Sequence, residues 1–277
     1  MNEIDATKFV VLTRGRTGST AIIDEINKHE DVVCWQELFI NLDSDPMLKE
    51  LYDNFGVDFD RYGLQDWFPT FDLWLKQTKT FKLFSKDVYF YKGKLLTISK
   101  IMKTYLQEME NHAFDLGNQA VGFKLLGHQV LNLPAFLAVL KELDYKVIYL
   151  ERKNVVKQVL SGVIANKRKV YNQRNYIPDN KSFSVDLNEF KFLVSVEMSE
   201  VNVQKSMIEF SEIESLYVSY EDFLSDRKRF HTAIFDFLKV EDKEIEESSF
   251  SIVIPDVKNV VENYDEFSEF LHETWSC

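Results

Sequence analysis

The sequence has few of the residues that mark secreted, fibrous or membrane-spanning chains. Its 277 residues include two cysteines, Cys34 and Cys277, which are too few for a disulfide scaffold, so we expect free thiols in a reducing compartment. Nine glycines and five prolines form no linker, repeat or low-complexity tract. No apolar run approaches the roughly 18 residues of a membrane span. The polar first residues, MNEIDATKF, do not resemble a signal peptide. We therefore expect a cytoplasmic protein without a transmembrane segment.

Positive charge is also scarce. The chain has 33 lysines and arginines against 45 acidic residues, a net charge of −12. Proteins that bind nucleic acid along their surface are normally basic, so we expect no nucleic-acid partner. A hydrophobic content of 45% with 23 phenylalanines is enough to fill a sizeable core. The length permits one large α/β domain, and we expect a single domain over residues 1–277. The oligomeric state does not follow from these properties.

Alternating strand and helix patterns run along most of the chain. Short β-branched and aromatic segments predict buried parallel strands at Lys8–Thr13, Val32–Trp35, Ala120–Leu125, Tyr145–Leu150 and Leu216–Tyr220. Amphipathic segments predict helices at Thr20–Lys28, Leu95–Met109, Leu133–Leu143, Asn154–Val170, Leu187–Phe210 and Asp222–Leu238. This order favours a three-layer, doubly wound α/β fold with a parallel sheet. Such sheets bind ligands beyond the carboxyl ends of their strands.

The segment Pro46–Lys94 departs from this alternation. It interleaves many aromatic residues with lysines. One interpretation is an aromatic sub-core covered by solvated lysines. The other is a helical cap over an acceptor site, with an aromatic surface that holds a sugar or another ring. We expect an aromatic-rich helical insertion in either case.

The stretch RGRTGST, residues 14–20, lies between the first predicted strand and the first predicted helix. A glycine-containing turn in this place directs backbone N–H groups at an anion, and the helix adds its positive N-terminal end. Gly15 and Gly18 give the turn its conformational freedom. Ser19 and Thr20 offer hydroxyl groups, while the Arg16 guanidinium offers a fork of donors. The stretch predicts a phosphate-binding loop.

The loop differs from the common loop for nucleoside triphosphates. That pattern, G-x-x-x-x-G-K-[ST], requires a lysine where this chain has Ser19 after Gly18. We also find no downstream aspartate suited to a nucleotide-bound magnesium ion. The sequence therefore predicts binding of a phosphate-like group without a triphosphate–metal assembly.

The loop resembles the 5′-phosphosulfate loop of sulfotransferases that use 3′-phosphoadenosine 5′-phosphosulfate (PAPS). That family has a basic residue, then Ser/Thr-Gly-Ser/Thr-Thr, and here Arg16 is followed by Thr17-Gly18-Ser19-Thr20. The resemblance implies a P-loop-like fold. It also implies that Arg14, Gly15 and these five residues bind the 5′ end of the cofactor.

A second stretch, KVIYLERKNVVKQVLSGVIANK, starts at Lys146 and is similar to the family's 3′-phosphate site. There an arginine follows a strand, and a serine lies eight or nine residues later on the next helix. Arg152 and Ser161 match these two positions. The form is closest to bacterial carbohydrate and glycolipid sulfotransferases. Lys153-Asn154 replaces the Asn-Pro that follows the arginine in cytosolic animal relatives.

A third stretch, SLYVSYEDFLSD, contains the Tyr-Glu-Asp that lies beside the cofactor's adenine in the family. The resemblance implies that Tyr220 stacks on the purine. The family's late Arg-Lys-Gly phosphate contact is not evident in this chain. Lys258 is our candidate to replace it.

Three residues are candidates for chemistry on an acceptor hydroxyl. Glu37-Leu38-Phe39 resembles the place where bacterial relatives have their proposed general base, and desolvation by aromatic neighbours would make Glu37 a better base. His128 is the second candidate, because imidazole titrates in a useful range. Lys124 lies on the same predicted strand and would face the transferring sulfonate. Each has an ordinary structural interpretation as well: a solvated glutamate, a buried histidine or a salt-bridged lysine.

The resemblance implies transfer of a sulfuryl group from PAPS to a hydroxyl of a carbohydrate, glycolipid or small metabolite, leaving 3′-phosphoadenosine 5′-phosphate (PAP). We expect no metal, because no histidine lies at metal-ligand spacing from a cysteine. Two alternatives stay open. A P-loop kinase predicts binding of ATP with magnesium, and an inactive relative predicts cofactor binding without transfer.

Overall fold

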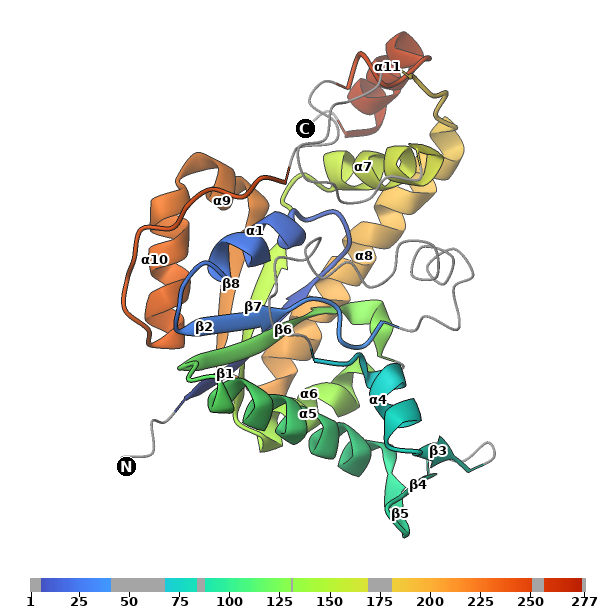
Figure 1. Ribbon diagram of the computed structural model, residues 1–277. Helices are drawn as coiled ribbons and strands as arrows, with labels where there is room; N and C mark the ends of the chain where they lie inside the picture. The colour runs from blue at the N-terminus through green and yellow to red at the C-terminus, as the bar shows by residue number, and fades with distance from the viewer. Residues whose placement is uncertain are drawn as a thin grey trace.

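The computed structural model describes residues 6–40, 68–83, 88–130, 132–168, 181–250 and 257–275. Its centre is a five-stranded parallel sheet in the order β2-β6-β1-β7-β8 (Figure 1). The strands are β1 (Thr7–Thr13), β2 (Val32–Trp35), β6 (Ala120–Leu126), β7 (Tyr145–Glu151) and β8 (Ser215–Ser219). All five predicted strands are confirmed, each to within one residue at either end.

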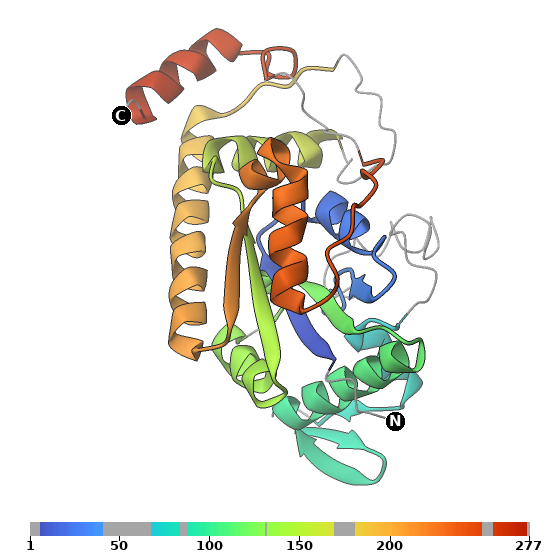
Figure 2. The ribbon, with the colours of Figure 1, turned by 90° about the vertical axis from the view of Figure 1, so that its left-hand side faces the viewer.

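Helices cover both faces of this sheet (Figure 2). On β1, Val10 and Leu12 pack toward one face while Phe9 and Val11 pack toward the other, as the alternation of side chains along a strand requires. The first face is covered by α5 (Ile98–Asp115), α6 (Leu133–Glu142) and α8 (Leu187–Ser211), and the second by α1 (Ser19–Ile26) and α10 (Arg227–Leu238). The expected three-layer α/β fold is confirmed.

A third cluster of buried side chains lies above the carboxyl ends of the strands. It joins α7 (Val155–Arg168), the first half of α8 and α11 (Tyr264–Trp275) through Leu160, Ile164, Phe190 and Phe267, among others. Figures 1 and 2 show α7 and α11 together at the top of the molecule. This cluster holds α7 over the loop that follows β1.

Two helix predictions are wrong at their boundaries. Leu95–Met109 is not helical from its start: Lys94–Thr97 forms strand β5, and α5 begins at Ile98, where the Thr97 hydroxyl accepts a hydrogen bond from the Lys100 N–H. Asp222–Leu238 is two helices rather than one, α9 (Tyr220–Ser225) and α10. Asp226 has an extended φ of −154° and caps α10 through the Arg229 N–H, which ends the helical run.

The insertion contains strands as well as the expected helix. Residues 41–67 and 84–87 lie outside the described part. The rest forms α4 (Phe71–Gln77) and an antiparallel sheet of β3 (Phe81–Lys82), β4 (Val88–Tyr91) and β5. Trp74 Nε1 and the Tyr91 hydroxyl both donate to Glu108, at 2.7 and 3.0 Å, and the two rings stack 5.6 Å apart. These contacts support the sub-core interpretation for this part, while a cap over an acceptor site stays a prediction.

No helix in the described part of the chain has the length and apolar character needed to span a bilayer.

One buried histidine gives the fold a predictable dependence on pH. His231 on α10 is 4% exposed, and its Nε2 lies 3.3 Å from Glu25 Oε2 on α1. Burial, together with the nearby charge of Arg227, lowers the pKa of His231 to about 4. Because the unfolded chain binds this proton below about pH 6.5, the stabilising effect of the neutral ring is complete above pH 6.5 and is lost as the pH falls toward 4.

We expect the free energy of unfolding of the native protein to fall by about 2 kcal/mol more between pH 7 and pH 5 than that of His231→Gln. Urea unfolding at the two pH values measures this difference. Equal slopes for both proteins would show that His231 does not titrate between the folded and unfolded states in this way.

Candidate functional site

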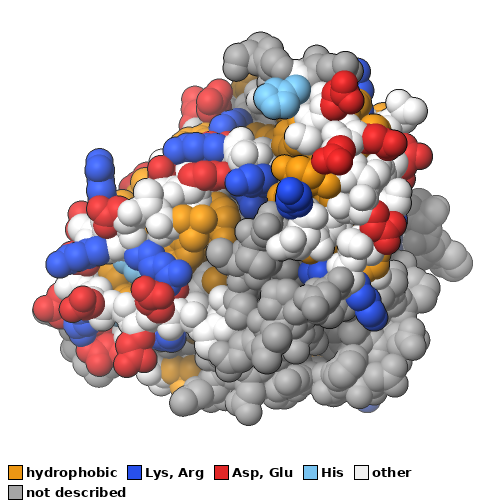
Figure 3. Space-filling view, turned by 90° about the horizontal axis from the view of Figure 1, so that it is seen from above, with side chains coloured by type: hydrophobic (Ala, Val, Ile, Leu, Met, Phe, Trp, Pro, Cys, Tyr) orange, Lys and Arg blue, Asp and Glu red, His pale blue; other side chains and the backbone are white. Residues whose placement is uncertain are grey.

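The predicted site residues come from loops at one edge of the sheet. Since the five strands are parallel, their carboxyl ends meet at that edge, which faces upward in Figure 1. Each of these residues lies at or just after the end of a strand. They are Arg16 after β1, Glu37 after β2, Lys124 near the end of β6, His128 after β6, Arg152 after β7 and Tyr220 after β8. Figure 3 views this side from above, with basic side chains near its middle and many acidic ones toward its flanks.

The loop after β1 is held together by hydrogen bonds of the Thr17 hydroxyl. The Thr17 hydroxyl lies 2.7 Å from that of Thr13 and donates to the Arg14 carbonyl at 3.1 Å, which leaves it fully buried inside the loop. Ser19 and Thr20 open α1, which has no side-chain N-cap. Among the described residues, neither hydroxyl has a hydrogen-bond partner. The loop therefore presents two hydroxyls and the first N–H groups of α1, as the sequence predicts for an anion site.

Tyr220 lies directly against this loop. Gly18 has φ +75° and ψ 6°, and a Cβ built there would lie 2.4 Å from two carbons of the Tyr220 ring. Burial raises the pKa of the Tyr220 hydroxyl. The tyrosine expected beside the adenine is thus brought next to the phosphate loop, although it opens helix α9 rather than ending strand β8. Gly18 is needed both for its positive φ and for the space that the ring occupies.

We expect Gly18→Ala to lower the free energy of unfolding by about 2 kcal/mol or more, from left-handed backbone strain and the clash with Tyr220. Gly15→Ala is the matched control, because no atom lies within 4 Å of a Cβ at that position and its φ is not positive. Urea unfolding of both variants checks the prediction. A stability loss of the same size at Gly15 would contradict it.

Three predicted residues meet above the loop. Arg16, with φ 66°, donates from Nε to the Ser161 hydroxyl on α7 at 3.2 Å, and Arg152 donates from Nη1 to the Arg16 carbonyl at 3.2 Å. Arg152 Nε is buried without a hydrogen-bond partner in the described part, and burial lowers the pKa of this guanidinium. No carboxylate of the described residues forms an ion pair with Arg152. A half-buried cation with a buried, unused donor suits an anion site.

The Arg152 guanidinium also lies over the Tyr220 ring, 5.0 Å from its centroid. One residue predicted for the 3′-phosphate and one predicted for the adenine are therefore neighbours. With Arg16 in contact with Ser161, the loop, the Arg152/Ser161 pair and Tyr220 form one continuous group. Sequence spacing alone does not place them together.

Arg14, also predicted to bind the cofactor, is turned toward α8. Its guanidinium forms two hydrogen bonds to Glu197, at 3.0 and 2.8 Å, and a third to Glu200 at 3.3 Å. Gln158 on α7 bridges the Gly15 carbonyl and Glu197, at 2.8 and 2.9 Å. Each of the three Arg14 guanidinium nitrogens already donates to a carboxylate, so we infer that Arg14 anchors the loop to α8. Sequence reasoning missed Glu197 and Gln158.

The turn after Arg152 is held by the acidic residues of the Tyr-Glu-Asp stretch. Glu221 accepts from the N–H groups of Lys153 and Asn154 at 2.8 and 3.0 Å, and Asp222 pairs with the Lys153 ammonium at 3.0 Å. Lys153-Asn154 stands where cytosolic animal sulfotransferases have Asn-Pro. Both of its backbone N–H groups donate to Glu221. Glu221 was not among the predicted site residues, and it links the adenine stretch to the Arg152 turn.

Glu37 and Lys124 form an ion pair of 2.7 Å near the end of β6. Lys124 is 3% exposed, and the other Glu37 oxygen accepts from Gln129 Nε2 at 2.7 Å. Gln129 is itself fixed by the Leu126 N–H at 3.0 Å. The two candidates for chemistry are therefore in direct contact, and Gln129 is a second partner that the sequence analysis missed.

His128 lies in the short helix η1 (Gly127–Gln129) and is exposed. Desolvation, with the nearby charge of Arg14, lowers the pKa of its imidazole, which favours the neutral form at pH 7. It has no hydrogen-bond partner among the described residues, so it is not the buried structural histidine of the ordinary interpretation. Lys258 is exposed in the turn before α11, and its phosphate role stays a prediction.

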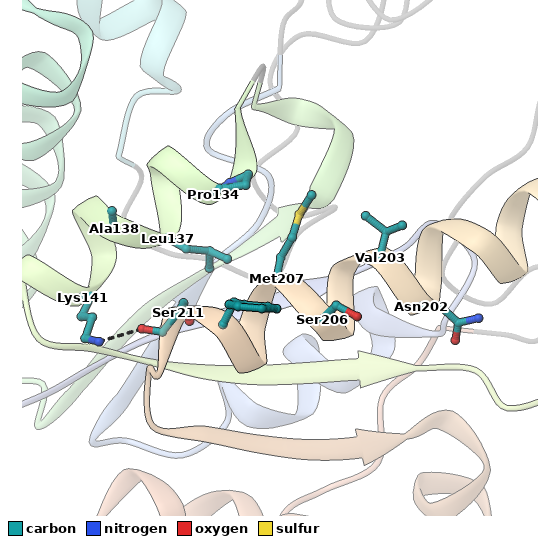
Figure 4. Close-up of a pocket in the computed structure, with 10 residues that line it drawn as sticks. Pro134, Leu137, Ala138, Lys141, Asn202, Val203, Ser206, Met207 and Ser211 are labelled. Carbon is teal, nitrogen blue, oxygen red and sulfur yellow. Dashed lines mark hydrogen bonds between the residues drawn. The ribbon is translucent and has the colours of Figure 1, made fainter.

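Two other features were tested as sites. Among the described residues, no three His, Cys, Asp or Glu side chains gather as a metal site would require. A groove of about 700 Å³ lies between α6 and α8 (Figure 4). It is mostly apolar, with Leu137, Met207 and Phe210 in its lining, and contains none of the residues above. The carboxyl edge of the sheet is therefore the better candidate.

The fold and this edge define an α/β protein with a candidate anion site at the carboxyl ends of its parallel strands. In comparisons with known proteins, no family model and no curated protein matches the chain. Several solved structures are similar to it, among them two sulfotransferases. A sulfotransferase domain from the curacin biosynthetic pathway has 13% identity and a TM-score of 0.48 over 86% of this chain and 75% of that one. A sulfotransferase from Alicyclobacillus acidocaldarius has 13% identity and a TM-score of 0.46 over 96% and 92%.

Proposed function

We propose that the protein is a sulfotransferase that moves the sulfuryl group of PAPS to a hydroxyl of a carbohydrate, glycolipid or small metabolite. The observation that carries the proposal is the meeting of Arg16, Ser161 and Arg152 beside the N-terminus of α1, with the Tyr220 ring against Gly18. A nucleotide with separate 5′ and 3′ phosphates needs an anion site at each end of its ribose and a flat surface for its base. This edge offers groups for all three.

Each group has a defined role in this proposal. The α1 N–H groups with Ser19 and Thr20 bind the 5′ phosphate, and Arg16 neutralises the charge that grows on the leaving oxygen. Arg152, with Ser161, binds the 3′ phosphate, for which its unused buried donor is suited. PAPS supplies an activated sulfuryl group, so the protein's task is alignment and charge neutralisation.

Glu37 is the proposed base. It takes the acceptor hydroxyl's proton while the acceptor oxygen bonds to sulfur and the bond from sulfur to the phosphate oxygen breaks, with the electron pair leaving on PAP. One of its carboxylate oxygens is paired with the Lys124 ammonium at 2.7 Å, so this oxygen is not open to the acceptor. We infer that Lys124 turns to the sulfonate during transfer, which frees Glu37. His128, neutral at pH 7, is the alternative base.

The proposal is tested by following ³⁵S-labelled PAPS with a panel of hydroxyl acceptors in the presence of EDTA. We expect label transfer and release of PAP without divalent metal. Transfer from ATP that requires magnesium would favour the P-loop kinase. PAP binding without transfer to any acceptor, unchanged in Glu37→Gln, would favour an inactive relative.

A further inference from the structure

The small sheet β3-β4-β5 carries an apolar row on its outer face. Phe81, Phe90 and Leu95 are direct cross-strand partners, so their side chains share one face of this sheet. The Phe81 and Phe90 rings lie 5.3 Å apart, and Phe81 and Leu95 are 52% and 63% exposed. The opposite face, with Tyr89 and Tyr91, packs into the core. The row therefore faces away from the protein's own core.

Lysines are concentrated in and near this small sheet in an otherwise acidic chain. Between Asp72 and Glu108 the sequence has eight lysines and one acidic residue, Asp87, whereas the whole chain has a net charge of −12. Six of these lysines are exposed: Lys76, Lys79, Lys82, Lys92, Lys94 and Lys100. Two of them, Lys79 and Lys92, occupy turns with positive φ of 55° and 44°. Lys82, Lys92 and Lys94 belong to the small sheet or its turn, and Lys82 and Lys94 pair with Tyr89 and Tyr91, so these two lie on the face opposite the apolar row.

The sheet projects from the body of the protein. Figures 1 and 2 both show β4 and β5 extending beyond α5, at the end opposite α7 and α11. A projecting surface of this kind suits a flat partner better than a partner that needs a groove. The mostly apolar groove described above lies elsewhere, between α6 and α8.

We propose that this basic projection, formed by β3, β4 and β5, docks the protein on an anionic lipid surface. The lysines are attracted to negatively charged headgroups, while Phe81, Phe90 and Leu95 enter the boundary between headgroups and acyl chains. The long lysine side chains reach outward from an inserted sheet. A second copy of the chain is a poor occupant, since a symmetric contact would set the same lysines against one another. The proposal does not depend on the sulfotransferase function.

The test is sedimentation of the full chain with vesicles of phosphatidylcholine alone or mixed with equal phosphatidylglycerol. We expect binding to the mixed vesicles only, and weaker binding at high salt. Each lysine near an anionic surface contributes about fivefold, so Lys79→Glu/Lys94→Glu should reduce binding about 25-fold or more. Phe81→Ser/Leu95→Ser should also reduce binding to the mixed vesicles, because it removes the inserting apolar groups. Both side chains are exposed, so the substitution leaves the core intact.

Matched controls use the same substitutions elsewhere. Lys228→Glu/Lys239→Glu makes the same charge change at two exposed positions, one on α10 and one just after it. Phe210→Ser removes an apolar side chain of α8 that is 90% exposed. We expect both controls to bind like the native chain. Equal loss in the lysine controls would show that only net charge matters and would overturn the proposal. Absence of binding to the mixed vesicles would also overturn it and would turn attention to an acidic protein partner.

Discussion

Glu37→Gln is expected to slow sulfuryl transfer by about 10²–10⁴ while leaving PAP affinity nearly unchanged. The amide oxygen can still accept from Lys124, so the substitution removes proton acceptance with little change in shape. Gln129 donates to the other carboxylate oxygen and is held by the Leu126 N–H, so the substitution loses this one hydrogen bond. Single-turnover transfer from labelled PAPS, with PAP affinity measured in parallel, separates the two effects.

His128→Asn is the control for this prediction, because His128 is the other candidate base at the same edge. We expect it to retain most activity. Full activity of Glu37→Gln together with an inactive His128→Asn would assign the base to His128. Loss of PAP binding in Glu37→Gln would mean that Glu37 shapes the cofactor site and would contradict its assignment as the base.

Arg152→Ala is expected to weaken PAP binding by about 1.5–3 kcal/mol, which is about 10- to 150-fold in the dissociation constant. Its affinity for adenosine 5′-phosphate, which lacks the 3′ phosphate, should change little. The reason is that Arg152 is half-buried, has an unused buried Nε and forms no ion pair with a carboxylate in the described part of the chain. Competition binding with the two nucleotides measures this discrimination.

Arg14→Ala is the matched control, with the same residue type in the same region. Its guanidinium is already bound to Glu197 and Glu200, so we expect a loss of stability without a loss of discrimination between the two nucleotides. If Arg152→Ala keeps the native preference for PAP, Arg152 does not bind a 3′ phosphate. If Arg14→Ala loses that preference instead, the two arginines have exchanged roles relative to our proposal.

The sheet could be predicted because its signal is local. β1, β6 and β7 are short apolar runs buried on both faces, and the alternation with helices then favours a parallel arrangement. Two helix boundaries were predicted wrongly because single residues determine where these helices begin and end. Gly93, with φ +79°, turns the chain between β4 and β5, so Lys94–Thr97 pairs with β4 rather than starting a helix. Asp226 similarly divides an apparently continuous helical pattern.

The site could be predicted in part. Arg16, Ser161, Arg152 and Tyr220 were predicted from a family resemblance, and the parallel sheet brings their loops to one edge, while their binding roles stay predictions. Their partners were missed because those contacts join distant residues. Arg14 meets Glu197 across 183 positions, and Gln129 reaches Glu37 across 92.

Sequence spacing also does not show which arginine N–H donors are bound to carboxylates of the protein itself. For this reason the sequence analysis placed Arg14 and Arg16 together at the cofactor, whereas the structure gives Arg14 two carboxylate partners on α8. Only the burial and pairing of each guanidinium separate an anchoring arginine from one with a donor left for a ligand.

The central claim is that this edge binds a nucleotide with a 5′ and a 3′ phosphate without metal. Calorimetric titration of the native chain with PAP, and separately with ATP plus magnesium, tests it most directly. We expect tight binding of PAP in the presence of EDTA and no binding of ATP with magnesium. Binding of ATP with magnesium but not of PAP would contradict it and would make the loop a triphosphate site that lacks the usual lysine.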